Sequence, residues 1–238
     1  MNKSYSVIAN SYDNLTHNDC DYTSWSQYLF AVATKHKAKT VADLACGTGK
    51  MTALLCKRGL QVVGVDSSAE MLAQACKKCR AIFVEQNMQK LKLTRPMDMA
   101  VCVNDGTNYI PPQDLVAFFQ AVKANLKSGA PFVFDVSSAY KLQNVVANNV
   151  FYVDDQNKTL LWTNTLEQNS VTMNLTMFTK CGNTYNRSDE SHTQYIHTQQ
   201  CVEECLQNAG FTLVEVTADY GKPLQADSLR ITFYATNN

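Results

Sequence analysis

The residues with the clearest capacity for chemistry form a glycine-rich turn after a short apolar run. The run 41–44 continues into Ala45-Cys46-Gly47-Thr48-Gly49, and a helical pattern of apolar residues begins at Lys50. Glycine has no Cβ, so its backbone can adopt positive φ angles and can approach a ligand closely. The pattern predicts a strand, a ligand-binding turn and a helix, which together suit a nucleotide-like ligand.

The spacing of the glycines separates the possible ligand classes. A phosphate-binding loop requires a first glycine where Leu44 stands and a hydroxyl residue where Met51 stands. The dinucleotide fingerprint requires a third glycine where Thr52 stands, which disfavours a nicotinamide oxidoreductase. The remaining string, Asp43-Leu44-Ala45-Cys46-Gly47-Thr48-Gly49, resembles motif I of the class I S-adenosylmethionine-dependent methyltransferases.

This resemblance implies a cofactor, S-adenosyl-L-methionine, whose product is S-adenosyl-L-homocysteine. In the family the acid and the loop of motif I hold the methionine end of the cofactor. The corresponding residues here are Asp43, Ala45, Gly47 and Gly49.

The next apolar run, 61–66, ends in Asp66. An Asp at the carboxyl end of a strand can accept hydrogen bonds from both hydroxyls of a ribose. Ser67 and Glu70 then predict a capping box, with Ser67 as the N-cap of a helix whose inner face carries Met71. We expect Asp66, Ser67 and Met71 to line the cofactor site.

A third predicted strand, 81–85, leads to Asn87 and Met88. The family usually has an Asp with an apolar neighbour here, around the adenine. Asn87 departs from that pattern, but its amide oxygen can still accept a hydrogen bond from the adenine amino group.

A fourth predicted strand, 98–103, leads to Asn104, Asp105 and Tyr109. This segment resembles motif IV, where cofactor and acceptor meet in the family. The resemblance makes Asn104 and Tyr109 cofactor contacts and Asp105 a catalytic candidate. Because the carboxyl ends of parallel strands share one edge of a sheet, these strand ends predict a crevice there.

The amino-terminal segment is rich in aromatic residues. Tyr12, Tyr22 and Trp25 lie in a segment that resembles the lid of small-molecule methyltransferases, which folds over the cofactor. Aromatic faces attract cations such as a sulfonium by about 0.5 to 2 kcal/mol each. These three residues are therefore candidate cofactor or substrate contacts.

His192, before the helix predicted to follow Thr198, is a second catalytic candidate because it could take a proton from the acceptor. A base is needed mainly when the acceptor starts protonated, since a sulfonium is already activated. No acidic pair with metal-ligand spacing is visible in the sequence, so we expect no metal.

The order of the elements predicts the fold. Strands alternate with helices, which indicates an α/β, Rossmann-like seven-stranded sheet with helices on both faces. The segment between Tyr220 and Ser228 is too short for a crossover helix, so we expect the last strand, 229–235, to be antiparallel. From about residue 150 to 193, polar and apolar residues alternate, which predicts an inserted antiparallel β meander.

These patterns divide the chain into three parts. We expect residues 1–40 to form an N-terminal helical lid, residues 41–145 and 196–238 the S-adenosylmethionine-binding domain, and residues 146–195 a β subdomain over the active site.

The composition limits the partners. Lys and Arg total 21, Asp and Glu total 21, and no run of like charges stands out, so we expect no nucleic-acid partner. No stretch resembles a signal peptide or a membrane span, and nine scattered cysteines suit a reducing compartment. We expect a cytoplasmic protein without membrane contact, either a monomer or a homodimer.

The leading hypothesis is a methyltransferase that moves a methyl group from S-adenosylmethionine to nitrogen or oxygen of a small molecule. One alternative is a methyltransferase acting on RNA or protein, which would need a basic stripe beside the pocket. Another is a non-catalytic, S-adenosylmethionine-binding regulatory protein, in which the acceptor space would be filled.

Overall fold

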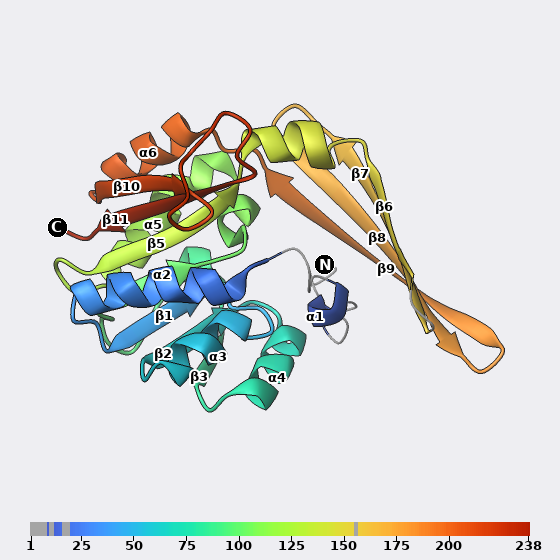
Figure 1. Cartoon of the computed structure of the whole chain (residues 1–238), viewed down its shortest axis with the longest axis horizontal. Coiled ribbons are helices and arrows are strands. Elements are labelled where there is room, and N and C mark those ends of the chain that lie inside the picture. Colours follow the sequence, from blue (N-terminus) through green and yellow to red (C-terminus); the bar gives the residue numbers. More distant parts are fainter. Residues whose placement is uncertain (1–8, 10–11, 16–19, 155–156) are drawn as a thin grey trace.

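The computed structural model describes residues 9, 12–15, 20–154 and 157–238. In these ranges the strands form a seven-stranded sheet and a four-stranded sheet (Figure 1). The order in the larger sheet is β10-β11-β5-β4-β1-β2-β3. Its strands are β1 (Thr40–Leu44), β2 (Gln61–Asp66), β3 (Ile82–Glu85), β4 (Met99–Cys102), β5 (Pro131–Ser137), β10 (Thr212–Ala218) and β11 (Arg230–Thr236).

The strand directions confirm the predicted fold class. β1 pairs in parallel with β2 and β4, β2 with β3, and β4 with β5. β11 runs antiparallel to both of its neighbours, β5 and β10. The parallel pairing brings the carboxyl ends of β1, β2, β3 and β4 to one edge of the sheet.

Helices cover both faces of this sheet because the strand residues alternate between two apolar layers. Met99 and Val101 of β4 pack with α2 (Tyr22–Lys35) and α3 (Lys50–Lys57). Ala100 and Cys102 of the same strand lie in the opposite layer, with α5 (Leu115–Ala124) and α6 (Gln199–Asn208). The aromatic side chains of that second layer are all phenylalanines, namely Phe118, Phe119, Phe132, Phe134, Phe211 and Phe233.

Helix α4 (Ala69–Lys78) begins one residue later than the sequence predicts. Its N-cap is Ser68, whose hydroxyl accepts from the backbone N–H of Met71 at 3.2 Å. The prediction of Ser67 as the N-cap was wrong because the Ser68 N–H is bonded to the Asp66 carboxylate, which extends the turn after β2 by one residue. Ser67 is left beside the strand edge.

The four-stranded sheet lies between β5 and α6 in the chain, as the meander prediction expected. Its strands are β6 (Val150–Asp154), β7 (Lys158–Leu166), β8 (Ser170–Cys181) and β9 (Thr184–Tyr195), paired antiparallel in that order. We call this sheet the β-arm, since it projects from the α/β body (Figure 1). Helix α1 (Tyr12–Leu15) lies between the two, and Tyr12 packs against apolar residues of the arm.

A π-helical segment, η4 (Lys141–Val146), connects β5 to the β-arm and has no counterpart in the sequence prediction. Its buried side chains Leu142 and Val146 pack against Val171 and Met173 of β8. Among the described residues, no helix is both long enough and apolar enough to span a membrane.

We predict that Gly49→Ala destabilises the protein more than Gly47→Ala does. Both glycines have positive φ, +75° and +52°, so each alanine would be strained. A Cβ on Gly49 would lie 2.8 Å from the Ala75 Cβ of α4, whereas a Cβ on Gly47 would meet no atom within 4 Å. Urea unfolding should show an extra loss of about 1–3 kcal/mol for Gly49→Ala, and equal losses would contradict this packing.

Candidate active site

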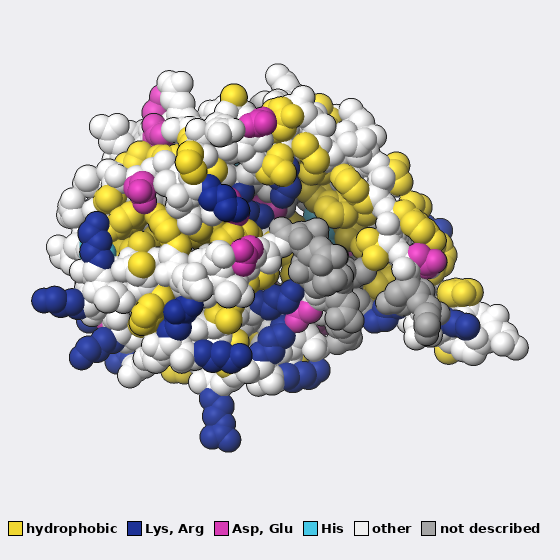
Figure 2. Space-filling view, viewed as in Figure 1, with side chains coloured by type: hydrophobic (Ala, Val, Ile, Leu, Met, Phe, Trp, Pro, Cys, Tyr) yellow, Lys and Arg dark blue, Asp and Glu magenta, His cyan; other side chains and the backbone are white. Residues whose placement is uncertain are grey.

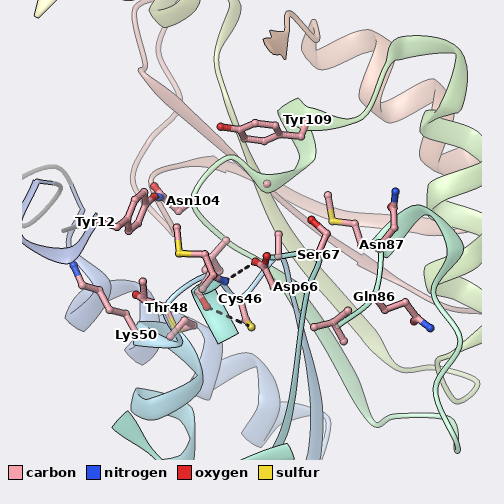
Figure 3. Close-up of a pocket in the computed structure, with 18 of the residues that line it drawn as sticks. Tyr12, Cys46, Thr48, Lys50, Asp66, Ser67, Gln86, Asn87, Asn104 and Tyr109 are labelled. Atoms are coloured by element: carbon pink, nitrogen blue, oxygen red, sulfur yellow. Dashed lines mark hydrogen bonds between the residues drawn. The ribbon is translucent and has the colours of Figure 1, made fainter. Parts of the chain in front are cut away.

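Most of the predicted cofactor contacts line one cavity at the carboxyl ends of β1, β2, β3 and β4. The empty space in and around the cavity is about 1060 Å³, which includes solvent at its open mouth. Figure 3 shows that it is elongated, with Lys50 and Tyr12 toward one end, Asp66 in the middle and Asn87 toward the other end. The predicted residues on its wall are Tyr12, Tyr22, Ala45, Gly47, Asp66, Ser67, Met71, Asn87, Met88, Asn104 and Tyr109.

Asp66 links the glycine turn to β2. One carboxylate oxygen accepts from the backbone N–H of Gly47 at 2.8 Å, and the other accepts from Ser68 at 2.9 Å. Burial raises the pKa of Asp66, and these backbone hydrogen bonds offset part of that rise. Each carboxylate oxygen has a second acceptor position, so the group can still bind two hydroxyl donors from a ligand.

Asp43 and Gly49 lie beneath the cavity and do not line it. Asp43 is fully buried, and one of its oxygens accepts from the Thr52 hydroxyl at 2.5 Å. Burial raises the pKa of Asp43 to about 7, although the Thr52 hydrogen bond acts in the opposite direction. Gly49 is the N-cap of α3, and the space beside its Cα is filled by Ala75. Both residues support the turn from below.

Asn87 and Met88 line the far end of the cavity. The Asn87 side-chain oxygen accepts from the backbone N–H of Gln89 at 2.8 Å and thereby caps the short helix η1 (Met88–Lys90). An amide oxygen has two lone pairs, so one acceptor position remains. The Met88 side chain supplies an apolar surface beside it.

The turn after β4 has an unusual backbone. Asn104 and Asp105 have φ angles of 61° and 57°, in the left-handed region that non-glycine residues rarely adopt. Their N–H groups donate to the two oxygens of Asp135, at 2.7 and 2.6 Å. Asp135 also accepts from Arg230 and Tyr220, and all three of these side chains are buried. The Asp135 carboxylate therefore sets the shape of this turn.

Arg230 joins this carboxylate to the cavity wall. Burial alone would lower the pKa of Arg230, but the facing Asp135 carboxylate raises it above its ordinary value. The guanidinium also donates to the Asn104 side-chain oxygen at 3.1 Å, and the Asn104 amide donates to the Tyr12 hydroxyl at 3.2 Å. Asn104 and Tyr12 are thus held together on the cavity wall.

Asp105 does not line the cavity and is turned toward the β-arm instead. One of its carboxylate oxygens accepts from the Ser137 hydroxyl at 3.0 Å and from the Gln194 amide of β9 at 3.1 Å. Lys141 of η4 donates to the same Ser137 hydroxyl at 3.0 Å. The turn thus places Asn104 on the cavity wall and Asp105 against the β-arm.

His192 also belongs to the arm and does not line the cavity. It is buried on β9, where its Nε2 lies 3.2 Å from a carboxylate oxygen of Glu190. Its ring makes a T-shaped contact with the ring of Tyr109, which does line the cavity, and the ring centroids are 6.1 Å apart. His192 therefore lies just behind the cavity wall, on the same side as Asp105.

The predicted aromatic contacts of the lid divide into two groups. Tyr12 and Tyr22 line the cavity, and Lys50 lies over the Tyr22 ring. Trp25 instead stacks on Tyr220 in the core and is 2% exposed, because α2 is packed against the sheet and not over the cavity.

Asp13, beside Tyr12, ties α1 to the cavity rim. It accepts from the Thr48 hydroxyl at 2.6 Å and pairs with Lys78 at 2.5 Å. Burial raises the pKa of Asp13, but the hydrogen bonds from Lys78 and Thr48 outweigh it, so the pKa lies below its ordinary value.

Sequence reasoning missed several residues of this region. Asp135 is the one that the sequence could most readily have predicted. An acid in the otherwise apolar strand 131–136 indicates a buried charge that needs a partner. Gly106 was missed although it lines the cavity; a Cβ there would lie 2.8 Å from the Cys102 sulfur. Glu190 and Gln194 carry no local signal, because only the pairing of β9 brings them to the site.

Comparisons with known proteins decide the family. A family model described as a methyltransferase domain matches residues 41–129. A Bacillus subtilis protein named as a methyltransferase, YqeM, is 31% identical over 224 residues, which cover 91% of this chain and 90% of the relative. The chain belongs to the class I S-adenosylmethionine-dependent methyltransferase family.

Solved structures agree with this assignment. An S-adenosylmethionine-dependent methyltransferase from Clostridium acetobutylicum is 32% identical, with a TM-score of 0.88 and coverage of 96% of this chain and 97% of that one. CalS10, an amino pentose methyltransferase from Micromonospora echinaspora with S-adenosylmethionine bound, shares the fold at 15% identity, with a TM-score of 0.76 and coverage of 100% and 99%. The cofactor of this methyltransferase is S-adenosylmethionine.

The cavity fits this cofactor chemically. Asp66 offers two acceptor positions in its middle, the Asn87 end has an apolar surface, and the Lys50 end has a cation. The bare Cα of Gly106 lets this turn pack closely on its neighbours, since a Cβ there would lie 2.8 Å from the Cys102 sulfur and 2.9 Å from the Ala45 Cβ. Among the described residues, no three metal-ligating side chains come together.

We predict that Asp135→Asn lowers the free energy of unfolding by about 3–5 kcal/mol, because it leaves the buried Arg230 guanidinium without its charged partner. Asp189→Asn, which breaks an exposed pair with Arg187, is the matched control and should leave the urea midpoint unchanged. Similar midpoints for the two variants would show that the buried pair has no special role.

The raised pKa of Asp43 predicts a dependence of stability on pH. Because the folded-state pKa of about 7 lies above the unfolded value of about 3.9, the folded protein binds more protons between these values, and stability falls as pH rises toward 7. From pH 5 to 7.5, the stability of the wild type relative to Asp43→Asn should fall by about 2–3 kcal/mol. Urea unfolding at both pH values measures this, and a constant difference would mean that Asp43 is ionised throughout.

Proposed function

We propose that this methyltransferase transfers a methyl group to nitrogen or oxygen of a small-molecule acceptor. The observation that carries the proposal is the attachment of the β-arm to the segment after β4, directly beside the cavity. β9 of the arm is bonded to the turn after β4 by Gln194 and by the Tyr195 carbonyl, which accepts from Asn108 at 3.0 Å. An acceptor that enters between body and arm must be small enough to lie under the arm.

We assign each part of the cofactor to one region of the cavity. Asp66 would accept from the ribose hydroxyls, and Asn87 with Met88 would hold the adenine. The turn at Ala45 and Gly47, with Lys50 and the aromatic faces of Tyr12 and Tyr22, would hold the methionine end. This order follows the sequence of residues along the elongated cavity (Figure 3).

When bound, the cofactor supplies an activated methyl group on a positively charged sulfur. The protein then needs to hold the acceptor atom in line with that methyl group, at about 3–3.5 Å, and to exclude water. Asn104 and Tyr12, fixed to each other by a hydrogen bond, are placed to orient the cofactor side. Asp105 is placed to orient the acceptor side.

Two further observations support a small acceptor. The net charge of the chain is zero, and on the visible face Lys and Arg side chains lie mostly in the lower half of the body as separate groups, with the acidic side chains mostly above them (Figure 2). CalS10, which shares the fold, is an amino pentose methyltransferase. A nucleic-acid substrate would instead favour a continuous basic stripe beside the cavity.

We predict that S-adenosylhomocysteine at a hundredfold excess over its Kd stabilises the protein by about 2.7 kcal/mol, a rise of roughly 5–10 °C in the melting midpoint, and that NAD causes no shift. We also predict that Asp66→Asn weakens the binding of S-adenosylhomocysteine by about 10- to 100-fold, because this change removes the charged acceptor for the ribose hydroxyls. Glu70→Gln, an acid-to-amide change close by but off the cavity wall, is the control.

The acceptor class can be tested with methyl-labelled S-adenosylmethionine and a bacterial cell extract separated into small molecules, RNA and protein. We expect label in the small-molecule fraction only. Label in RNA or protein would replace the proposal with the alternative acceptor class, and S-adenosylhomocysteine binding without label anywhere would favour a regulatory protein.

A further inference from the structure

The charges of the chain divide between two regions, although they sum to zero. Residues 35–98 contain twelve Lys and Arg against five Asp and Glu, and the rest of the chain contains nine against sixteen. The first region is thus +7 and the remainder −7. Such an asymmetry indicates a partner of high charge. The expectation of no nucleic-acid partner depends on the net charge, which hides this division.

The segments that lead into β1, β2, β3 and β4 lie side by side at the amino-terminal edge of the parallel strands, opposite the cofactor cavity. They are residues 35–39, 57–60, 79–81 and 91–98. The Gln61 N–H donates to the Lys39 carbonyl at 2.9 Å, which joins β2 to the segment before β1. Asp98, before β4, accepts from the Lys39 N–H at 2.9 Å. β3 follows, since Ile82 pairs with Val63 near the start of β2.

These segments carry seven exposed cations, which we call the basic edge. They are Lys35, Lys37, Lys39, Lys57, Arg80, Lys92 and Arg95. Within the described part of the chain, none of the seven forms an ion pair. The one carboxylate of the four segments, Asp98, is bonded to backbone N–H groups and pairs with Lys127 at 2.6 Å. With about 4.8 Å between strands, the basic edge spans roughly 14 Å from β4 to β3.

Helix ends account for only part of the basic edge. Lys35 and Lys57 lie in the last turns of α2 and α3, where a cation interacts favourably with the helix dipole. The other five cations lie outside the helices, so the dipole does not explain them. Like charges held along one edge repel one another, and a partner that supplies negative charge relieves that repulsion.

The side chains around these cations indicate which anionic partner fits. The four segments contain no Phe, Tyr or Trp, whereas the centres of protein interfaces are rich in aromatic residues and poor in Lys. Ile82 is the large apolar side chain exposed beside the edge, and one such residue gives a membrane little to hold. Unpaired bases stack on aromatic side chains, so the composition favours a duplex, which presents its phosphates outward.

We propose that the basic edge binds the phosphate backbone of a nucleic-acid duplex without reading its sequence. The cations follow a line across four strands, as the phosphates of one strand do along a duplex. Because the cofactor cavity lies at the opposite edge of the sheet, the bound duplex is not the methyl acceptor. The inference is therefore independent of the small-molecule acceptor proposed above.

Fluorescence anisotropy of a labelled 20-base-pair DNA duplex, titrated with the full chain at 50 and 200 mM salt, tests the proposal. We expect equal affinity for two unrelated sequences, and an RNA duplex of the same length should also bind. About four phosphate contacts, one for each segment, predict a slope of about −3.6 in log K against log salt concentration. The affinity should then fall roughly 150-fold between the two salt concentrations.

Two triple variants make the test specific. The edge variant combines Lys37→Gln, Lys92→Gln and Arg95→Gln. The control variant combines Lys180→Gln, Arg187→Gln and Lys222→Gln, three exposed cations outside the edge. Both change the net charge equally, but only the edge variant should weaken duplex binding at 50 mM salt, by at least about tenfold, and lower the slope by about 2–3. Both should keep the thermal shift caused by S-adenosylhomocysteine, since none of the six residues lines the cavity.

Several results would overturn the inference and leave the methyltransferase proposal standing. No duplex binding at 50 mM salt, or equal losses in the edge and control variants, would remove the basic edge as a nucleic-acid site. Tighter binding to phosphatidylserine vesicles than to the duplex would identify a membrane as the partner, and tighter binding to polyglutamate would identify an acidic protein. A strong preference for one of the two sequences would contradict contacts to the backbone alone.

Discussion

A buried pair, Asp135 of β5 and Arg230 of β11, fixes the turn after β4 that borders the cavity. Both N–H groups of the left-handed turn at Asn104 and Asp105 donate to the Asp135 carboxylate, and Arg230 and Tyr220 donate to it as well. Left-handed backbone at non-glycine residues costs about 1–3 kcal/mol per residue and persists only where the surroundings enforce it. Here the enforcing group is one carboxylate neutralised by one guanidinium.

This pair also gives the antiparallel last strand a role. β11 lies between β5 and β10, and its first residue, Arg230, pairs in register with Ser137 at the end of β5. A strand of the opposite direction places its beginning, and hence Arg230, at the carboxyl edge of its parallel neighbours. The sheet topology thus brings a cation from the end of the chain to a turn that lies more than a hundred residues earlier.

The turn divides the site between the body and the β-arm. Asn104 faces the cavity with Tyr12, and Asp105 faces Gln194 and Ser137. The α/β body alone can build a cofactor site, since the residues of its strand ends line the cavity. The arm adds side chains of β9 next to this site, since Gln194 is bonded to Asp105 and His192 meets Tyr109.

The sequence predicts the fold and most of the cavity wall because these depend on local patterns. Each parallel strand is an apolar run that ends in a polar residue, and shared strand direction brings those ends together without knowledge of distant contacts. The sequence could not show that Tyr22 lines the cavity whereas Trp25 lies in the core, because both a lid and a core use aromatic residues three apart on a helix. Asp43 follows the family pattern, but burial under the turn depends on packing that a motif does not encode.

The sequence could not predict the positions of residues that depend on pairing between distant parts of the chain. The partner of Asp135 lies 95 residues away, and Glu190 and Gln194 reach the site only through the register of β8 and β9. His192 was identified as a candidate from its place before a helix, without its carboxylate neighbour.

We expect the one cavity to orient the cofactor with its sulfur toward Asn104 and the β-arm. A crystal structure of the complex with S-adenosylhomocysteine would show this orientation. We expect the ribose hydroxyls on Asp66, the adenine beside Asn87 and Met88, and the sulfur between Asn104 and Tyr12, on the side of Asp105. Ligand density outside this cavity, or adenine at the Lys50 end, would refute this orientation.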